Sequence, residues 1–187
     1  RPPRDYEAIK EAARARSDAI SSAGRDIGEL PPVENPERKE KAGQDFRFFC
    51  EAYFSETFHL QWSDDHLKVI QKIEQAVLHG GLFALAMPRG SGKTSLCETA
   101  CLWAILYGHR EFVCLIGSDE KSALEMLESI KMELDSNDLL LADFPEAVYP
   151  IQKLDGIAHR ANGQLYHGER THIGWTAREI VLPSIDG

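Results

Sequence analysis

Apolar residues recur along this chain with two spacings, and each spacing predicts a different kind of element. Apolar positions three or four apart run through 63–79, 91–107 and 120–134, as on the buried face of a helix. Unbroken apolar runs occupy 82–86 and 112–116, and such runs are typical of strands covered on both faces in a parallel sheet. The middle of the chain therefore predicts helices and strands in alternation.

Capping residues support two of these helices. Ser63 is a good N-cap for the first of them, and Gly80 and Gly81 are placed to end it. Asp119 is placed as the N-cap of the helix that starts at Glu120. The helix that follows Ser63 is amphipathic, so we expect it to pack on the core.

The N-terminal part of the chain has a different pattern. A mostly polar helix is predicted over 5–22, and the proline-containing stretch 30–36 breaks it and marks a linker. A further helix is predicted over 37–54, where it ends in a cluster of aromatic residues. We therefore expect residues 1–45 to form a helical extension or linker ahead of the main domain.

The segment from Met87 to Thr94 joins a predicted strand to a predicted helix and has the composition of a phosphate-binding loop. Gly90 and Gly92 permit a tight turn that aims backbone N–H groups inward. Lys93 can reach the β- and γ-phosphates, and the Thr94 hydroxyl can ligate Mg²⁺. Met87 stands where the usual pattern has its first glycine. We expect a bound nucleoside triphosphate to contact Pro88, Arg89, Gly90, Ser91, Gly92, Lys93, Thr94 and Ser95.

The elements around this loop predict the fold class. Short β-branched or alternating stretches after Pro150 predict strands over 163–166, 171–175 and 179–182. Strands and helices alternating around a phosphate loop favour an α/β fold of the P-loop NTPase type, a mainly parallel sheet sandwiched by helices. We expect this domain over 46–187, with the helical extension ahead of it.

Charge does not favour a nucleic-acid surface on these residues. The 187 residues include 21 Lys and Arg against 30 Asp and Glu, a formal net charge of −9. Residues 1–41 are neutral, so the acidic excess lies in 42–187. Nucleic-acid binding normally needs a basic footprint. If the protein acts on DNA, we expect most of the contact to lie elsewhere.

The sequence also predicts no membrane segment and no metal cluster. No apolar run approaches the roughly 18 residues of a membrane span, and the start lacks the apolar stretch of a secretory signal. The cysteines show no Cys-x-x-Cys spacing, so we expect buried free thiols; they are Cys50, Cys97, Cys101 and Cys114. Three histidines also lack a zinc-site spacing; they are His159, His167 and His172.

No clear partner for the Mg²⁺ ion is evident. P-loop enzymes that hydrolyse ATP hold the metal with an Asp, usually beside a Glu, at the end of an apolar strand. Asp119 is better placed as a helix cap, Asp143 fits a helical turn, and Asp186 follows a proline that a central strand does not tolerate. We expect the chain to be part of a longer protein whose carboxylate motif lies beyond Gly187, so hydrolysis by these residues alone stays open.

The loop from Met87 to Thr94 contains Pro-Arg-Gly-x-Gly-Lys-Thr, and it resembles the loop of tailed-bacteriophage terminase large subunits, the ATP-driven DNA-packaging motors. The stretch from Phe144 to Glu146 also fits, and 174–183 resembles the segment that such proteins carry shortly before their carboxylate motif. The resemblance covers about residues 46–187, and loop and segment together make it specific.

The resemblance implies specific roles. Lys93 and Arg89 would be catalytic, with Arg89 stabilising the γ-phosphate in cis, and Thr94 would hold Mg²⁺. Gln61 and Trp62, upstream of the loop, would contact the adenine of ATP, although core or cap roles fit them equally well. The longer protein would bind double-stranded DNA, the terminase small subunit and the portal, form a ring in the cytoplasm of an infected bacterium, and carry a nuclease domain.

Two other classes remain compatible with these residues. A different P-loop enzyme, such as a helicase-like ATPase or a small-molecule kinase, would share Lys93 and Thr94, although no basic lid of a kinase is found. A non-catalytic nucleotide-binding or recognition fragment is the other class. The packaging interpretation predicts that the next strand of the longer protein ends in Asp-Glu, whereas a binding module predicts no such pair.

Overall fold

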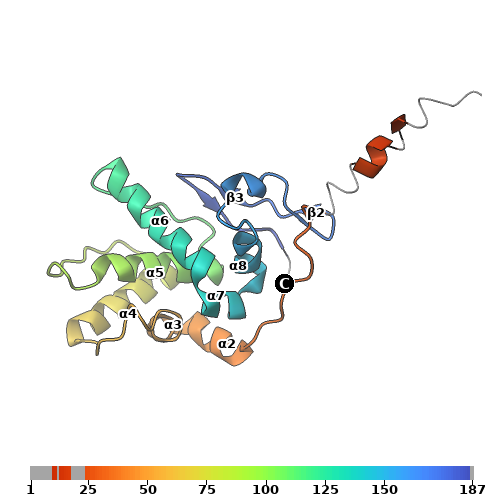
Figure 1. Ribbon diagram of the computed structural model, residues 1–187. Coiled ribbons are helices and arrows are strands. Elements are labelled where there is room, and N and C mark those ends of the chain that lie inside the picture. Colours follow the sequence, from red (N-terminus) through yellow and green to blue (C-terminus); the bar gives the residue numbers. More distant parts are fainter. Residues whose placement is uncertain (1–9, 12, 18–23, 186–187) are drawn as a thin grey trace, which may run out of the picture.

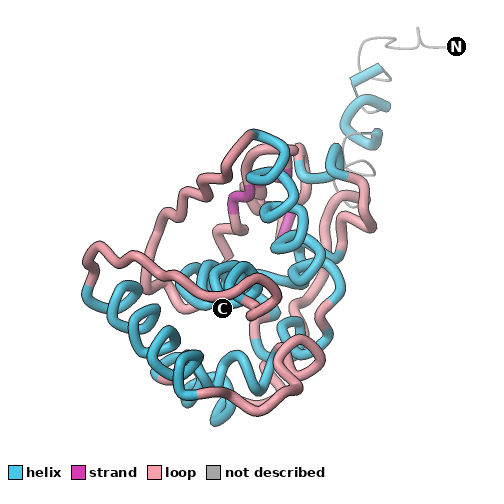
Figure 2. Tube along the Cα trace, turned by 90° about the vertical axis from the view of Figure 1, so that its left-hand side faces the viewer, coloured by secondary structure: helices cyan, strands magenta, loops and turns pink. Residues whose placement is uncertain are grey.

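The computed structural model describes residues 10–11, 13–17 and 24–185 (Figure 1). Most of the helix predicted over 5–22 lies outside these residues, and so does Asp186. Helices, cyan in Figure 2, are the main secondary structure in the described part of the chain. Their bounds are α2 Pro36–Gln44, α3 Phe46–Tyr53, α4 Asp64–His79, α5 Lys93–Leu106, α6 Glu120–Ser136, α7 Asp138–Asp143 and α8 Pro145–Gln152, followed by the 3-10 helix η1 Ala158–Ala161.

Four short strands follow the helices. β1 Leu165–Tyr166 pairs antiparallel with β2 Glu169–Arg170, and β3 Gly174–Trp175 pairs antiparallel with β4 Ile180–Val181. Figure 1 shows these hairpins on the α8 side of the helices. Parallel pairing in the described chain is limited to an isolated bridge between Asp26 and Leu165.

The capping residues in the sequence placed the ends of two helices correctly. The Ser63 hydroxyl accepts from the backbone N–H of His66 at the start of α4, and Gly80 caps the other end with a φ of 80°. Asp119 accepts from the N–H of Ser122 at the start of α6. The helix predicted over 37–54 is instead two helices, because the Asp45 carboxylate caps the start of α3.

The core forms where α3, α5, α7 and α8 meet, and aromatic rings fill it. Trp103 of α5 is fully buried and lies 5.2 Å, centroid to centroid, from the Phe46 ring. Its indole N–H donates to the carbonyl of Ala42 at 2.8 Å, so α2 is joined to α5. Tyr107 makes a second link, because its hydroxyl donates to the Lys39 carbonyl at 2.6 Å.

A buried carboxylate joins α2, α3 and α7. Asp143, fully buried, accepts from Arg38 Nε at 2.6 Å and from Arg38 Nη2 at 3.0 Å. It also accepts from the Tyr53 hydroxyl at 2.6 Å and from the Asn35 N–H at 3.1 Å. Burial favours the neutral acid, but the hydrogen bonds and the Arg38 charge outweigh it and hold the pKa of Asp143 below its ordinary value.

The predicted parallel α/β sheet is wrong for this structure. The runs 82–86 and 112–116 are loops, and their backbone groups make no hydrogen bond within the described residues. Both were expected to be buried, yet Leu82 is fully exposed, and Phe112 and Ile116 are 81% and 87% exposed. An apolar run becomes a sheet strand only when other strands pair with it, and the strands that do form pair with one another in hairpins.

None of the helices in the described part of the chain combines the length and the apolar composition that a membrane crossing needs.

Candidate nucleotide site

The predicted phosphate loop lies directly ahead of α5 and has the backbone that its glycines suggested. Gly90 and Gly92 have φ values of 76° and 74°, in the left-handed region where glycine is favoured. Gly92 is the N-cap of α5, and no side chain caps the first turn of this helix. The backbone N–H groups there are therefore available to an anion, which the helix dipole also favours.

Lys93 lies folded back over this loop. Its ammonium group donates to the carbonyl of Met87 at 2.6 Å and to that of Pro88 at 3.0 Å. The Ser91 hydroxyl donates to the same Pro88 carbonyl at 2.8 Å. A phosphate that enters the loop would thus meet a lysine already held at its edge, and binding would exchange contacts to neutral carbonyl oxygens for contacts to charged phosphate oxygens.

Two further loop residues point to solvent. Arg89 is exposed and makes no hydrogen bond or ion pair with any residue that the structure describes. Thr94 is exposed in the first turn of α5, and Ser95 beside it is half-buried. Arg89 and Thr94 are therefore accessible to a ligand, whereas Ser95 is only partly so.

The upstream candidates differ from each other. Trp62 is half-buried, with its ring centroid 5.2 Å from that of Phe58. Its indole N–H donates to Glu51 at 2.8 Å, so only the ring face remains for a ligand. Gln61 is exposed and without a hydrogen bond among the described residues. The aromatic ring can therefore stack on a base, whereas the amide is free to reorient.

His66 connects this aromatic cluster to the loop, and the sequence interpretation missed it. Its Nε2 lies 2.9 Å from the Ser91 carbonyl and its Nδ1 lies 2.7 Å from the Ser63 hydroxyl. A carbonyl oxygen only accepts, so Nε2 carries a proton and donates to it. The ring is also edge-on to Trp62, at 5.9 Å between centroids. The spacing of four residues between Trp62 and His66, across the start of α4, was the available signal.

Glu98 is a second residue that the sequence interpretation did not single out. It lies one turn after Thr94 on α5 and lines a cavity of about 70 Å³ together with Ser95 and Glu133. Burial is the main cause that raises the pKa of Glu98, and the nearby Glu133 adds to it, against a hydrogen bond from Ser129 at 3.0 Å. The sequence signal was weak, because a Glu in a helix is usually a solvated side chain.

The carboxylates that could have completed a hydrolytic site are occupied elsewhere. Asp119 caps α6, and the Ser122 backbone hydrogen bond lowers its pKa. Asp143 is held in the core by Arg38, and Asp186 is outside the described residues. Among the residues described, no group of three or more His, Cys, Asp or Glu side chains could hold a metal ion.

The cysteines are free, as expected, but only in part buried. Cys50 is buried, whereas Cys97 and Cys114 are exposed, so the prediction of buried thiols was wrong for these two. Cys114 is exposed because the run 112–116 does not enter a sheet.

Comparisons with known proteins add no family assignment. No protein-family description, no curated protein and no solved structure matches this chain. The site is therefore interpreted from its own residues.

Proposed function

We propose that this chain is the ATP-binding part of a viral DNA-packaging motor of the terminase large-subunit kind. In such a motor ATP hydrolysis drives double-stranded DNA into a procapsid. The observation that carries the proposal is the loop ahead of α5, where Gly90 and Gly92 have positive φ, the helix start is uncapped, and Lys93 lies across the loop.

The proposed roles follow from where the side chains lie. Lys93 would neutralise the β- and γ-phosphates of ATP, and the Thr94 hydroxyl would ligate the accompanying Mg²⁺. Arg89, exposed and unpaired in the described chain, would approach the γ-phosphate. Trp62 would offer its ring face to the adenine, with Gln61 beside it. The support lies in the loop and helix geometry and does not depend on a parallel sheet.

The packaging role itself is supported by the sequence resemblance in the loop and in 174–183. It implies a longer protein that has an Asp-Glu pair beyond Gly187, ATPase and endonuclease activities, and contacts with DNA, the terminase small subunit and the portal. A ring assembly in the infected bacterial cytoplasm is part of the same proposal.

Within residues 1–187 we propose binding of ATP without turnover. Asp119 and Asp143, two of the three carboxylates considered for the metal, are committed to a helix cap and to a buried ion pair. The Asp-Glu pair would have to come from the longer protein. A non-catalytic nucleotide-binding module shares this prediction and differs from the motor in lacking such a pair.

The test measures binding of a fluorescent ATP analogue with Mg²⁺ to the chain and to its Lys93→Ala variant. Loss of the ammonium contacts should weaken binding about tenfold to a hundredfold, the range for hydrogen bonds to charged groups. Lys121→Ala is the matched control, because Lys121 is an exposed lysine of α6 with only a weak i,i+4 contact to Glu125.

The outcomes separate the hypotheses. Binding that Lys93→Ala weakens at least about tenfold and Lys121→Ala preserves supports a nucleotide site, and ATP turnover confined to the longer protein supports the motor. Absence of any Lys93-dependent binding would refute the nucleotide site and with it the packaging proposal.

A further inference from the structure

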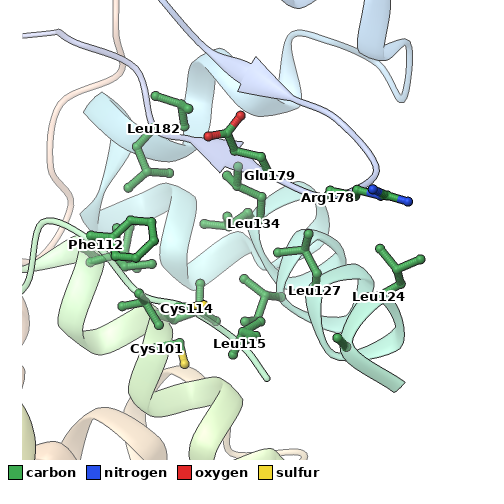
Figure 3. Close-up of a pocket in the computed structure, with 18 of the residues that line it drawn as sticks. Cys101, Phe112, Cys114, Leu115, Leu124, Leu127, Leu134, Arg178, Glu179 and Leu182 are labelled. Carbon is green, nitrogen blue, oxygen red and sulfur yellow. The ribbon is translucent and has the colours of Figure 1, made fainter. Parts of the chain in front are cut away.

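A large apolar groove lies outside the proposed nucleotide site. Its volume is about 960 Å³, and its walls are α5, α6, the segment 111–115 and the strand β4 with its neighbours (Figure 3). Figure 3 shows Leu127 and Leu134 of α6 and Leu182 after β4 directed into the same space, with Cys101 of α5 at its floor. Ligand pockets in proteins typically have volumes of about 300–1,000 Å³ and mostly apolar walls, so this groove has the size and lining of a binding site.

One wall of the groove has the properties of an unpaired strand. Exposure alternates along 112–117, with Val113 and Leu115 half-buried and their neighbours exposed, which is the two-residue period of a strand. No backbone N–H or C=O group of 112–116 makes a hydrogen bond within the described chain. Apolar backbone in this state is a template for pairing with another strand.

The exposed side of this wall is also apolar. Phe112 is 81% exposed and Ile116 is 87% exposed, although both belong to an unbroken apolar run. Contiguous apolar surface of this kind marks an interaction site more often than isolated exposed residues do.

The charges at the groove favour a basic occupant. Glu111 and Glu179 line the groove, and neither side chain has a cationic partner among the described residues. Glu120 lines it too, but it is paired with Arg178 at 2.5 Å. The net charge of −9 acts in the same direction. Two unpaired carboxylates therefore remain for lysine or arginine side chains of a partner.

We propose that this groove binds one β-strand of a partner polypeptide, a strand with apolar side chains between lysine or arginine residues. The strand would pair with the backbone of 112–116 and place apolar side chains between α5 and α6, in the β-augmentation mode of peptide recognition. A small apolar molecule could occupy the volume but would leave the backbone of 112–116 unpaired. The proposal does not depend on nucleotide binding.

The probe is a fluorescent peptide of about eight residues that alternates valine and threonine between terminal lysines, which is long enough to span about 27 Å as a strand. A second peptide has proline at the centre, which removes an N–H donor and disfavours pairing. A third ends in glutamates. Binding is followed by fluorescence anisotropy, and hydrogen exchange measures protection of the amides of 112–116.

Two variants test the wall and the charges. Phe112→Ser should weaken binding of the lysine-ended peptide about tenfold, as expected when an aromatic anchor of an interface is lost. Leu60→Ser is the matched control, because Leu60 is a similarly exposed apolar residue, at 75%, that does not line the groove. The double variant Glu111→Lys, Glu179→Lys should invert the preference and favour the glutamate-ended peptide.

Support consists of binding that proline and Phe112→Ser weaken, with slower exchange at 112–116. The proposal is overturned if the lysine-ended and proline peptides bind equally, or if no peptide binds. It is also overturned if sedimentation shows a dimer that Phe112→Ser dissociates and that excludes the peptide, because a second copy would then be the occupant. All variants are exposed-residue changes, and circular dichroism verifies that each remains folded.

Discussion

Removing the buried Asp143 carboxylate should lower the free energy of unfolding more than removing a carboxylate from the surface would. The carboxylate accepts four hydrogen bonds. Two come from the Arg38 guanidinium of α2, one from the Tyr53 hydroxyl of α3, and one from the backbone N–H of Asn35 just ahead of α2. In Asp143→Ala, the guanidinium of Arg38 and the hydroxyl of Tyr53 lose their acceptor. The Asn35 N–H loses its acceptor as well.

The magnitude follows from burial. Asp143 is 0% exposed and the Arg38 side chain is 23% exposed, so the pair is mostly shielded from water. Breaking a buried ion pair by removing one partner costs about 3–5 kcal/mol. We expect a loss near the lower end, about 3 kcal/mol, since Arg38 can partly rehydrate. That is a large share of the roughly 5–15 kcal/mol that stabilises a typical domain.

The pH dependence has a definite sign. The pKa of Asp143 is lowered in the folded protein, so its contribution is fully present above the pKa of an unfolded aspartate, about 3.9, and is lost as the pH falls towards the lower folded value. In Arg38→Met the guanidinium no longer offsets the cost of burying the charged carboxylate. The pKa of Asp143 in the folded protein should then rise above its unfolded value. Between pH 7 and about 4 that variant should gain stability on acidification, whereas the wild type should not.

Urea denaturation followed by tryptophan fluorescence, to which the buried Trp103 contributes, measures each free energy of unfolding. Asp135→Asn is the control, because Asp135 is exposed near the end of α6, and it should change stability by less than about 0.5 kcal/mol. Equal stabilities of Asp143→Ala and Asp135→Asn would refute the reasoning. If Asp143→Ala does not fold, the opposite pH response of Arg38→Met remains as the decisive measurement.

Two further predictions concern packing and thiol access. A Cβ added at Gly43 would lie 2.9 Å from two ring atoms of Tyr107, so Gly43→Ala should cost about 1–2 kcal/mol despite the better helix propensity of alanine, as urea denaturation can show. Cys97 and Cys114 are exposed, but burial raises the pKa of the Cys97 thiol, raises the pKa of Cys101 to about 12 and raises the pKa of Cys50 as well. Maleimide labelling read by peptide mass spectrometry should therefore modify Cys114 first, and faster labelling of Cys50 would contradict the described burial.

Local chemistry in the sequence determined much of the helical structure. Ser63 and Gly80 mark the two ends of α4, and Asp119 marks the start of α6, because a cap satisfies backbone groups within one turn of itself. Glycines at 90 and 92 likewise permitted the left-handed backbone of the loop. These features depend on neighbours in the chain, so a sequence pattern suffices to predict them.

The tertiary structure alone decided the contacts between distant segments. The partner of Asp143 is Arg38, 105 residues away, and the partner of His66 is the carbonyl of Ser91, 25 residues away. No local pattern encodes such pairs. The same limit explains the wrong sheet prediction: the apolar run 112–116 shows strand periodicity, but whether it pairs depends on which other strands come beside it, and hydrogen bonding between strands is non-local.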